Sequence, residues 1–323
     1  MDSRMQTTNP VVETAQKIKD EIQKAVVGQD SVIEQLLVAF LADGHVLLEG
    51  VPGTAKTLLV RALALVLDLP FTRVQFTPDL MPSDITGTNI YDANTSSFHL
   101  RQGPIFTSVL LADEINRTPP KTQSALLEAM EERNVTIDGV KHPLPKPFFV
   151  CATQNPIEFE GTYPLPEAQL DRFLLKILVD YPSDFEEKQI LNRYHQGFRS
   201  MKLEDAGLTS ILNAEGIAKL RVFVEGIGVE ERVVEYISDI VRKSRNSDYL
   251  MIGASPRAGI ALLLCSKALA ALRARDFVTP DDVKELAYPT LRHRILLRPE
   301  AEIEGLTADR VLAGIIDTIT VPR

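Results

Sequence analysis

Between residue 11 and about residue 180, short continuous apolar runs alternate with stretches in which apolar residues recur at helical spacing. Each apolar run ends in polar residues, a pattern that predicts a buried strand, whereas the periodic stretches predict helices. The predicted strands lie at residues 45–50, 108–114 and 147–155, and the predicted helices include residues 11–27 and 56–68. Buried strands that alternate with helices predict a parallel sheet covered on both faces, with functional residues at the carboxyl ends of the strands.

Two hairpins are predicted to interrupt this alternation, at residues 86–104 and 134–145. The first has alternating, strand-like arms on either side of the turn-forming residues 93–97. The second contains Asp138 and Gly139 in succession, which is a strong signal for a two-residue hairpin turn.

The pattern changes after Pro182, and the rest of the chain is predicted to be helical. Ser183 and Glu186 form a capping-box pattern at the start of one helix. Two later helices begin with a cap residue followed by proline, at Ser255 and at Thr279. We therefore expect two domains, an α/β domain over residues 1–182 and a helical domain over residues 183–323.

The composition of the 323-residue chain is that of an ordinary globular protein, with 45% hydrophobic and 24% charged residues. The formal net charge of −9 argues against a protein that binds duplex nucleic acid or an anionic membrane surface through bulk positive charge. Cys151 and Cys265 lie inside apolar segments without the spacing of metal ligands, so we expect reduced core residues. The polar N-terminal residues and the short apolar runs predict a cytoplasmic protein without a secretory signal or a membrane span.

Residues 50–57, GVPGTAKT, differ by one residue from the phosphate-binding pattern G-x-x-x-x-G-K-[ST]. A predicted strand precedes them and a predicted helix follows, so backbone N–H groups at the helix start would face a phosphate. Lys56 would add a positive charge there, and Thr57 would bind Mg²⁺. Ala55 replaces the second glycine of the pattern, and because Gly53 can supply the positive φ, we expect Ala55 to need only a negative φ. The alternative is a purely structural strand-to-helix turn.

Asp113 and Glu114 follow one another at the end of a predicted strand. Adjacent residues of a strand face opposite ways, so the two acids are expected to have different tasks. Asp113 would hold a metal ion through water, and Glu114 would polarise the water that attacks the γ-phosphate. Taken alone, such a pair is often a solvated strand end, but together with the phosphate loop it indicates a nucleotide hydrolase.

Seven motifs together resemble those of MoxR-type AAA+ ATPases, in the branch that also contains the ATPase subunits of magnesium chelatase. The resemblance covers nearly the whole chain and implies a P-loop AAA+ core, with a parallel five-stranded sheet flanked by helices, followed by a smaller all-helical lid. Phosphate loops of this family commonly read G-x-P-G-x-A-K-T, so Ala55 follows the family. The motifs are VVGQD at 26–30, GVPGTAKT at 50–57, FTPDLMPSDITG at 76–87, LLADEINR at 110–117, ATQNP at 152–156, YPLPEAQLDRF at 163–173 and GASPRAG at 253–259.

The resemblance also implies roles for single residues. Asn155 corresponds to the sensor-1 residue that orients the attacking water, although an Asn-Pro turn explains it as well. Arg172 resembles the arginine finger that reaches the nucleotide of the neighbouring subunit, or it pairs with Asp171 or Glu167 within its own chain.

Arg257 resembles the sensor-2 arginine, and whether it serves its own subunit or a neighbour is open. A charge argument supports a phosphate nearby. With Ser255 as the cap, Arg257 puts positive charge at a helix N-terminus, which is unfavourable by about 0.3–1 kcal/mol. The alternative is a neutral surface arginine.

ATP-binding residues are expected in two segments. Val27, Gly28 and Gln29 resemble the segment that packs on the adenine, although a buried turn explains them almost as well. The phosphate loop supplies Gly50, Val51, Pro52, Gly53, Thr54, Ala55, Lys56, Thr57 and Leu58. The basic run at residues 291–298 is either an interface or, more ordinarily, a solvated helix face.

The expected function is that of a chaperone-like, Mg²⁺-dependent ATPase. An arginine finger acting on a neighbour requires a ring, for which we expect six subunits, with the two hairpins facing the central channel. Relatives of this type remodel or mature protein partners, often partners with a von Willebrand factor A domain, and sometimes in the insertion of a metal cofactor.

Two other classes stay open at this point. A nucleic-acid motor would need basic hairpins, but these carry only Arg101, Lys141 and Lys146, so nucleic acid is not the expected partner. A nucleotide switch that does not hydrolyse ATP would retain its activity towards a partner when Glu114 is changed to Gln.

Overall fold

The computed structural model describes residues 9–155, 161–200 and 203–322. The chain divides into two compact units, one formed by Glu21–Ala214 and the other by the residues before Glu21 together with Glu215–Arg323. The predicted boundary near residue 182 is therefore misplaced. Residues 183–214 remain with the sheet-containing unit because they bond to it, for example through the N–H of Ile211, which donates to the Val66 carbonyl at 2.8 Å.

The unit Glu21–Ala214 contains the predicted parallel sheet, whose five strands lie in the order β2-β5-β8-β1-β9. Every neighbouring pair in this sheet is parallel. Three strands coincide with the apolar runs seen in the sequence, and β2 and β9 complete the sheet at its two edges. The strands are β1 (Val46–Glu49), β2 (Phe71–Gln75), β5 (Val109–Asp113), β8 (Phe149–Gln154) and β9 (Leu175–Leu178).

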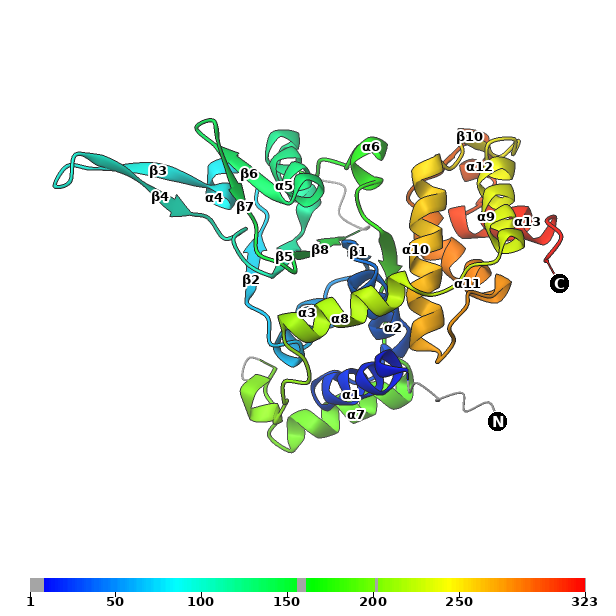
Figure 1. The fold of residues 1–323 in the computed structure, drawn as a ribbon, viewed down its shortest axis with the longest axis horizontal. Coiled ribbons are helices and arrows are strands. Elements are labelled where there is room, and N and C mark those ends of the chain that lie inside the picture. The colour runs from blue at the N-terminus through cyan, green and yellow to red at the C-terminus, as the bar shows by residue number, and fades with distance from the viewer. Residues whose placement is uncertain (1–8, 156–160, 201–202, 323) are drawn as a thin grey trace, which may run out of the picture. The chain divides into compact units, whose positions relative to one another are not determined.

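Helices cover the two faces of the sheet, with α5 on one side and α2 and α3 on the other (Figure 1). Alternate residues of the central strands serve the two faces. Val150 belongs to the cluster that contains Leu127 of α5, whereas the ring of Phe149 meets Phe40 of α2 edge-on at 5.3 Å. The helical segments are α1 (Pro10–Ala25), which the division between the units crosses, α2 (Asp30–Leu41), α3 (Lys56–Val66), α4 (Pro82–Thr86), η1 (Ile115–Arg117), α5 (Pro120–Glu132), α6 (Glu167–Leu170), α7 (Asp184–His195) and η2 (Leu203–Ala206).

Both predicted hairpins are present, β3 (Gly87–Asp92) with β4 (Ser97–Gln102), and β6 (Asn134–Ile137) with β7 (Val140–Pro143). Figure 1 shows that β3 and β4 extend away from the sheet. Asp138 and Gly139 both adopt positive φ, as the predicted two-residue turn requires.

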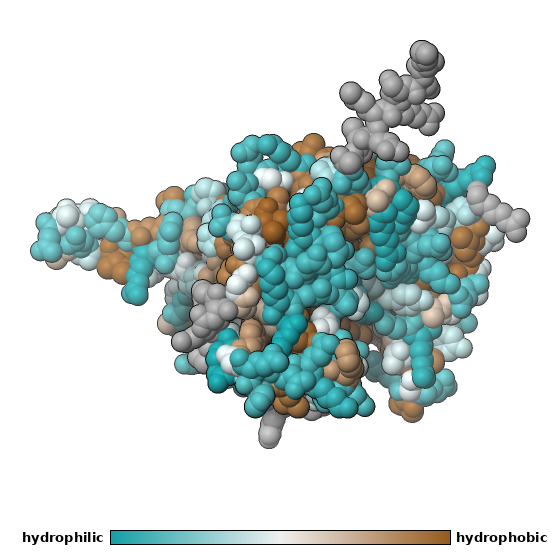
Figure 2. Space-filling view, turned by 90° about the horizontal axis from the view of Figure 1, so that it is seen from below, coloured by the Kyte–Doolittle hydropathy of each residue, from teal (hydrophilic) through white to brown (hydrophobic). Residues whose placement is uncertain are grey.

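The long hairpin exposes aromatic side chains. Figure 2 shows hydrophobic surface among its hydrophilic side chains. Tyr91 and Phe98 lie opposite each other with their ring centroids 5.2 Å apart, and 70% of Phe98 is exposed. At its base the hairpin is joined to the second one, because the side-chain amide of Asn89 donates to Asp138 at 2.7 Å.

The second unit is mainly helical, as expected, and two helices have the predicted caps. Ser255 accepts the N–H of Ala258, and Thr279 accepts the N–H of Asp282. The unit is not entirely helical, because Leu250 and Leu297 pair in a two-stranded antiparallel sheet too short to leave a sequence pattern. Its elements are α8 (Ala214–Glu225), α9 (Glu231–Ser244), β10 (Leu250–Ile252), α10 (Pro256–Leu272), α11 (Pro280–Leu291), β11 (Leu296–Leu297), α12 (Pro299–Ile303) and α13 (Ala308–Asp317).

The basic run at 291–298 belongs to the packing of this helical unit. Arg292 forms an ion pair with Asp309 of α13 at 2.9 Å. Arg294 is buried and donates to the backbone carbonyl of Thr290. Arg292 and Arg294 therefore do not fit a solvated helix face, since both have partners inside this unit. Arg298 is exposed, and the interface stays a prediction.

Two further expectations concern the cysteines and membrane spans. Cys151 and Cys265 are buried and carry free thiols, so their assignment as core residues is confirmed. In the described part of the chain, no helix combines the length and the apolar character that crossing a membrane requires.

Candidate functional site

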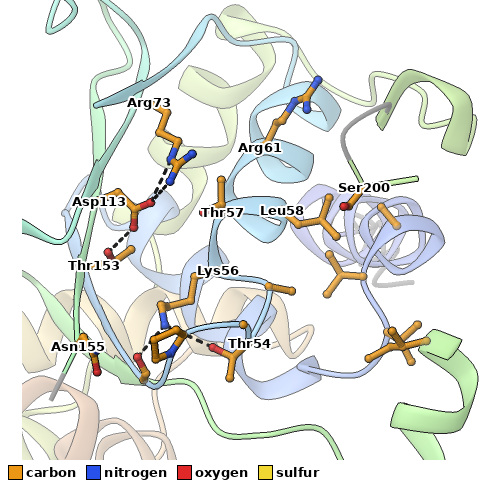
Figure 3. Close-up of a pocket in the computed structure, with 18 of the residues that line it drawn as sticks. Thr54, Lys56, Thr57, Leu58, Arg61, Arg73, Asp113, Thr153, Asn155 and Ser200 are labelled. Atoms are coloured by element: carbon orange, nitrogen blue, oxygen red, sulfur yellow. Dashed lines mark hydrogen bonds and ion pairs between the residues drawn. The ribbon is translucent and has the colours of Figure 1, made fainter. Parts of the chain in front are cut away.

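A cavity of about 840 Å³ lies at the carboxyl ends of β1, β5 and β8, where functional residues of a parallel sheet are expected. Figure 3 shows the phosphate loop and the start of α3 on one side of this cavity, and Arg73, Asp113 and Thr153 on another. The structure thus brings the loop and the acidic strand end together. The lining comprises residues of the loop and α3 (50, 52–58 and 61), of the segment before α2 (25–27), of β2 (71 and 73), of the ends of β5 and β8 (113–114 and 153–155), and of α7 and the following segment (190, 193–194, 198 and 200).

The phosphate loop runs from the end of β1 to the start of α3. Gly50 allows close packing there, because a Cβ atom at this position would lie 2.3 Å from the carbonyl oxygen of Val179. Gly53 has the predicted positive φ of 87°. Ala55 departs from the prediction, since its φ of 61° is left-handed.

The conformation of Ala55 follows from its place as the residue that precedes the first turn of α3. There the chain must bend sharply from the loop into the helix, so more than one residue adopts a left-handed conformation. An alanine in this conformation carries a strain of about 1–2 kcal/mol. Backbone strain of this kind is concentrated at functional sites.

Lys56 folds back over the loop that precedes it. Its ammonium group donates to the carbonyl oxygens of Gly50 and Val51, both at 2.7 Å. Burial lowers the pKa of Lys56, and the carboxylates of Asp113 and Glu114 oppose this shift. The lysine is therefore held at the centre of the loop, facing the two acids.

Asp113, at the end of β5, is 9% exposed and is fixed from both neighbouring strands. The hydroxyl of Thr153 on β8 donates to its Oδ1 at 2.6 Å. Arg73 on β2 donates to its Oδ2 through Nε at 3.0 Å and through Nη2 at 2.6 Å.

The carboxylate of Glu114 has partners of its own, different from those of the Asp113 carboxylate. Its φ of 56° turns the chain out of the strand, and its N–H donates to the Thr153 hydroxyl at 2.8 Å. Its Oε2 accepts from the amide of Gln75 at 2.6 Å and lies 3.1 Å from Nε of Arg117. The carboxylate is thus oriented from β2 and from η1.

Several residues of this site were not predicted from the sequence. Arg73 and Gln75 are exposed on either side of the buried Val74, so their spacing is a strand signal, but their relevance depends on β2 lying next to β5. Tyr194 and its neighbours on α7 were missed because the domain boundary was placed before that helix. Thr153 lies inside the motif ATQNP, which points to it directly.

The segment before α2 divides into two parts. Val27 lines the cavity, whereas Gly28 and Gln29 lie outside the lining. Gln29 donates through its side chain to the carbonyl of Asp180 at 3.0 Å. Gly28 packs against Glu186, since an added Cβ atom would lie 2.1 Å from Oε1 of that residue. Both residues therefore have a structural task at the start of α2.

The other expected residues lie in three different places. Asn155, 7% exposed, follows β8 and lines the cavity, whereas Val51 lies outside the lining. Arg172 lines a second cavity of about 510 Å³ between α5, α6 and the β6–β7 hairpin. Its Nη2 lies 3.2 Å from Oε2 of Glu131, a partner that was not considered in the sequence. Arg257 is the second residue of α10 in the helical unit, after the predicted cap Ser255.

The donor set is suited to Mg²⁺ bound together with a nucleotide. Thr57 and Asp113 both line the cavity and offer oxygen atoms, which Mg²⁺ prefers, and Mg²⁺ usually completes its shell with phosphate oxygens and waters. Among residues 9–155, 161–200 and 203–322, no group of three or more His, Cys, Asp and Glu side chains forms a metal cage of its own.

Comparison with known proteins matches both units. Residues 45–175 match the family described as "ATPase family associated with various cellular activities (AAA)", and residues 242–315 match the AAA lid domain. The chain is 48% identical to protein YeaC of Bacillus subtilis, over 95% of the chain and 94% of that protein. It is 43% identical to chaperone MoxR1 of Mycobacterium tuberculosis, over 97% of the chain and 83% of that protein.

Two further comparisons extend over almost the entire chain. It is 31% identical to protein MoxR of Methylorubrum extorquens, over 96% of each protein. A crystal structure of a candidate ATPase from Cytophaga hutchinsonii superposes with a TM-score of 0.88 at 41% identity, covering 97% of this chain and 96% of that one. The similarity therefore includes the cavity as well as the helical unit.

Proposed function

The chain belongs to the MoxR family of AAA ATPases, and on this basis we propose that it hydrolyses ATP as a ring-shaped oligomer in order to remodel or mature a protein partner. The family that its motifs resemble is thereby confirmed, and with it the binding and hydrolysis of ATP. The observation that carries the proposal is that the phosphate loop, Asp113, Glu114 and Asn155 line one cavity.

The phosphate loop binds the phosphates of ATP in this proposal. The N–H groups at the start of α3 provide donors and the positive end of the helix dipole. Lys56 exchanges the neutral carbonyl groups of Gly50 and Val51 for a phosphate oxygen, which is a stronger, charge-assisted partner.

Thr57 and Asp113 are the residues that would hold Mg²⁺. Bound there, the ion would neutralise charge on the phosphate oxygens. Thr153 keeps Asp113 in a fixed orientation for this task, because the Thr153 hydroxyl donates a hydrogen bond to the Asp113 carboxylate.

Glu114 acts on the attacking water. Its carboxylate takes up a proton as the water attacks the γ-phosphate, and Asn155 at the end of β8 orients the same water. The contact of Glu114 with Gln75 at 2.6 Å supports a fixed position for the base at the edge of the cavity.

The base of the nucleotide would lie at the apolar end of the cavity. Val26, Val27 and Ile190 provide aliphatic surface there, and Tyr194 and Phe198 form an aromatic pair with centroids 5.5 Å apart. This end combines residues before α2 with residues of α7. The site therefore includes residues that a boundary near residue 182 would assign to the other domain.

A ring assembly is supported by the position of Arg172, which lines a different cavity from the phosphate loop. An arginine placed in this way can serve as a finger for the nucleotide of a neighbouring subunit. Six subunits are the number that we propose, and Arg257 is proposed as a second arginine that contacts the nucleotide.

The substrate is proposed to be a protein. The name of the relative chaperone MoxR1 supports this class of substrate. A partner with a von Willebrand factor A domain, the insertion of a metal cofactor into that partner, and the cytoplasmic location stay predictions. The exposed rings of Tyr91 and Phe98 on the long hairpin favour a protein over the phosphate backbone of a nucleic acid.

The test uses Glu114→Gln and Lys56→Ala side by side. We expect Glu114→Gln to retain ATP binding and assembly while losing turnover, and Lys56→Ala to lose most ATP binding. Nucleotide binding would be measured by calorimetry, assembly by light scattering, and turnover by phosphate release. Turnover at the wild-type rate in Glu114→Gln would contradict the role of Glu114.

The same variant identifies the partner. Glu114→Gln with ATP should hold its partner long enough for capture, and the Lys56→Ala protein serves as the matched control. ATP turnover that increases several-fold with single- or double-stranded DNA at moderate salt would instead support a nucleic-acid motor.

A further inference from the structure

Arg73 is a third cation at the candidate site, after Lys56 and Arg61, and it lies directly on Asp113. It projects from β2 into the cavity, and its Nε and Nη2 both donate to Oδ2 of Asp113, at 3.0 and 2.6 Å (Figure 3). The contact joins an arginine that is half exposed to a carboxylate that is almost buried. The position of Arg73 therefore bears on how Asp113 can receive another cation.

The two oxygens of Asp113 are used differently. A carboxylate oxygen offers about two lone-pair positions, and Oδ2 already accepts two N–H groups from Arg73. Oδ1 accepts the Thr153 hydroxyl at 2.6 Å. A cation or its bound water that approaches Asp113 through Oδ2 must therefore displace a charge-assisted contact.

Charge adds to this competition. A guanidinium and a divalent cation on one carboxylate repel each other, and the low exposure of Asp113 reduces screening by water. Lys56 also interacts electrostatically with this carboxylate, so two positive groups, Lys56 and Arg73, already act on Asp113. Of these, Arg73 has an alternative partner within reach, because its Nη2 also donates to Oε1 of Gln75 at 3.0 Å.

We propose that Arg73 is a positioning residue that competes with Mg²⁺ for Asp113, so that the metal is held by Thr57 and Asp113 only when Arg73 has moved off Oδ2. This inference rests on the proposed function, since it concerns the metal of the same nucleotide site. Arg73 thereby raises the Mg²⁺ concentration that the site needs. In the displaced position, its contact with Gln75 keeps the guanidinium next to the cavity.

The experiment measures binding of the non-hydrolysable analogue AMP-PNP to the full-length protein by calorimetry, first with EDTA and then over a range of Mg²⁺ concentrations. For Arg73→Ala, we expect the half-saturating Mg²⁺ concentration to fall about tenfold, the order expected for loss of one charge-assisted competitor. Affinity for AMP-PNP in EDTA should change by less than about threefold, because the partners of Arg73 are Asp113 and Gln75.

Two variants control for charge and for folding. Arg310→Ala removes an exposed arginine of α13, outside the cavity, and should leave the Mg²⁺ requirement unchanged. Arg73→Lys keeps a cation near Asp113 and should give a requirement between those of the wild type and Arg73→Ala. Because Mn²⁺ can replace Mg²⁺ as a probe, electron paramagnetic resonance of Mn²⁺ with AMP-PNP measures the metal affinity directly, independent of turnover.

Three results would overturn the proposal. The Mg²⁺ requirement of Arg73→Ala could equal that of the wild type, or Arg310→Ala could show the same decrease. Loss of AMP-PNP affinity in EDTA would instead make Arg73 a phosphate-binding residue. Failure of the proposed function is distinguishable from all three, because the wild-type protein itself would then not bind AMP-PNP under either condition.

Discussion

Glu131 and Arg172 form an ion pair in which Oε2 lies 3.2 Å from Nη2, and the two side chains remain 39% and 28% exposed. The pair holds the proposed arginine finger against α5 at the surface of its unit. An exposed pair of this kind contributes little to stability, so Arg172 can exchange Glu131 for a more strongly charged partner. This pair therefore positions the proposed finger and leaves it able to change partner.

Arg172→Ala is expected to lower ATP turnover by on the order of 10³ while ATP binding stays within a few-fold of the wild type, because the finger stabilises only the transition state. Turnover is measured by phosphate release and binding by calorimetry. Glu128→Gln, on the same helix and lining the same cavity, is the matched control and should retain turnover. Wild-type turnover in Arg172→Ala would show that the finger is another residue.

Ala55→Gly is expected to retain ATP binding and to stabilise the protein by up to about 1 kcal/mol, since glycine adopts the φ of 61° without the strain of alanine. Urea unfolding, followed by circular dichroism, measures the change in the free energy of unfolding. Gly50→Ala provides the contrast, because its methyl group would meet the Val179 carbonyl and should destabilise the loop. A destabilised Ala55→Gly protein would indicate that Ala55 is not left-handed.

Cys151 and Cys265 are expected to resist thiol reagents in the folded protein at pH 8. Burial raises the pKa of Cys265 to about 12, although Arg294 and Thr290 oppose the shift, and burial raises the pKa of Cys151 well above its usual value. The reactive thiolate is thus almost absent at pH 8. Iodoacetamide labelling followed by mass spectrometry should modify both thiols in urea and neither without it. Rapid labelling of the folded protein would show that the thiols are accessible.

Asp282 is expected to stabilise the helical unit at neutral pH and to lose this effect in acid. Burial acts to raise the pKa of Asp282, but hydrogen bonds from Arg275 and from the backbone and hydroxyl of Thr279 outweigh it and lower the pKa. A carboxylate whose pKa is lower in the folded than in the unfolded state contributes stability above about pH 4, and the contribution fades as the pH falls through the folded pKa.

Asp282→Asn should therefore cost about 1–3 kcal/mol at pH 7 and progressively less below pH 4. Urea unfolding of the two proteins over this pH range measures the difference. Asp281→Asn, on the exposed side of the same helix turn, should cost little at either pH. A difference between wild type and Asp282→Asn that does not change with pH would show that the carboxylate is not charged in the folded protein.

Local sequence patterns predicted the strand ends and the phosphate loop, because neighbouring residues in the chain determine these features. Strand ends and the loop at Lys56 are specified by contiguous residues, and so the cavity could be placed from the sequence. The contacts of Arg73 and Gln75 with the two acids depend on strand order, since β2 lies next to β5 although about 40 residues separate Arg73 from Asp113. The backbone of Ala55 depends on how the loop enters α3, which residue type alone does not determine.

The helix α5 connects several parts of the candidate sites. It begins three residues after Arg117, which contacts Glu114, and its last turn carries Glu131, the partner of Arg172. The β6–β7 hairpin follows two residues after the helix ends. Thirteen helical residues form a stiff rod of about 20 Å. α5 therefore joins, along one rigid element, the acidic end of β5, the ion pair of Arg172 and the β6–β7 hairpin.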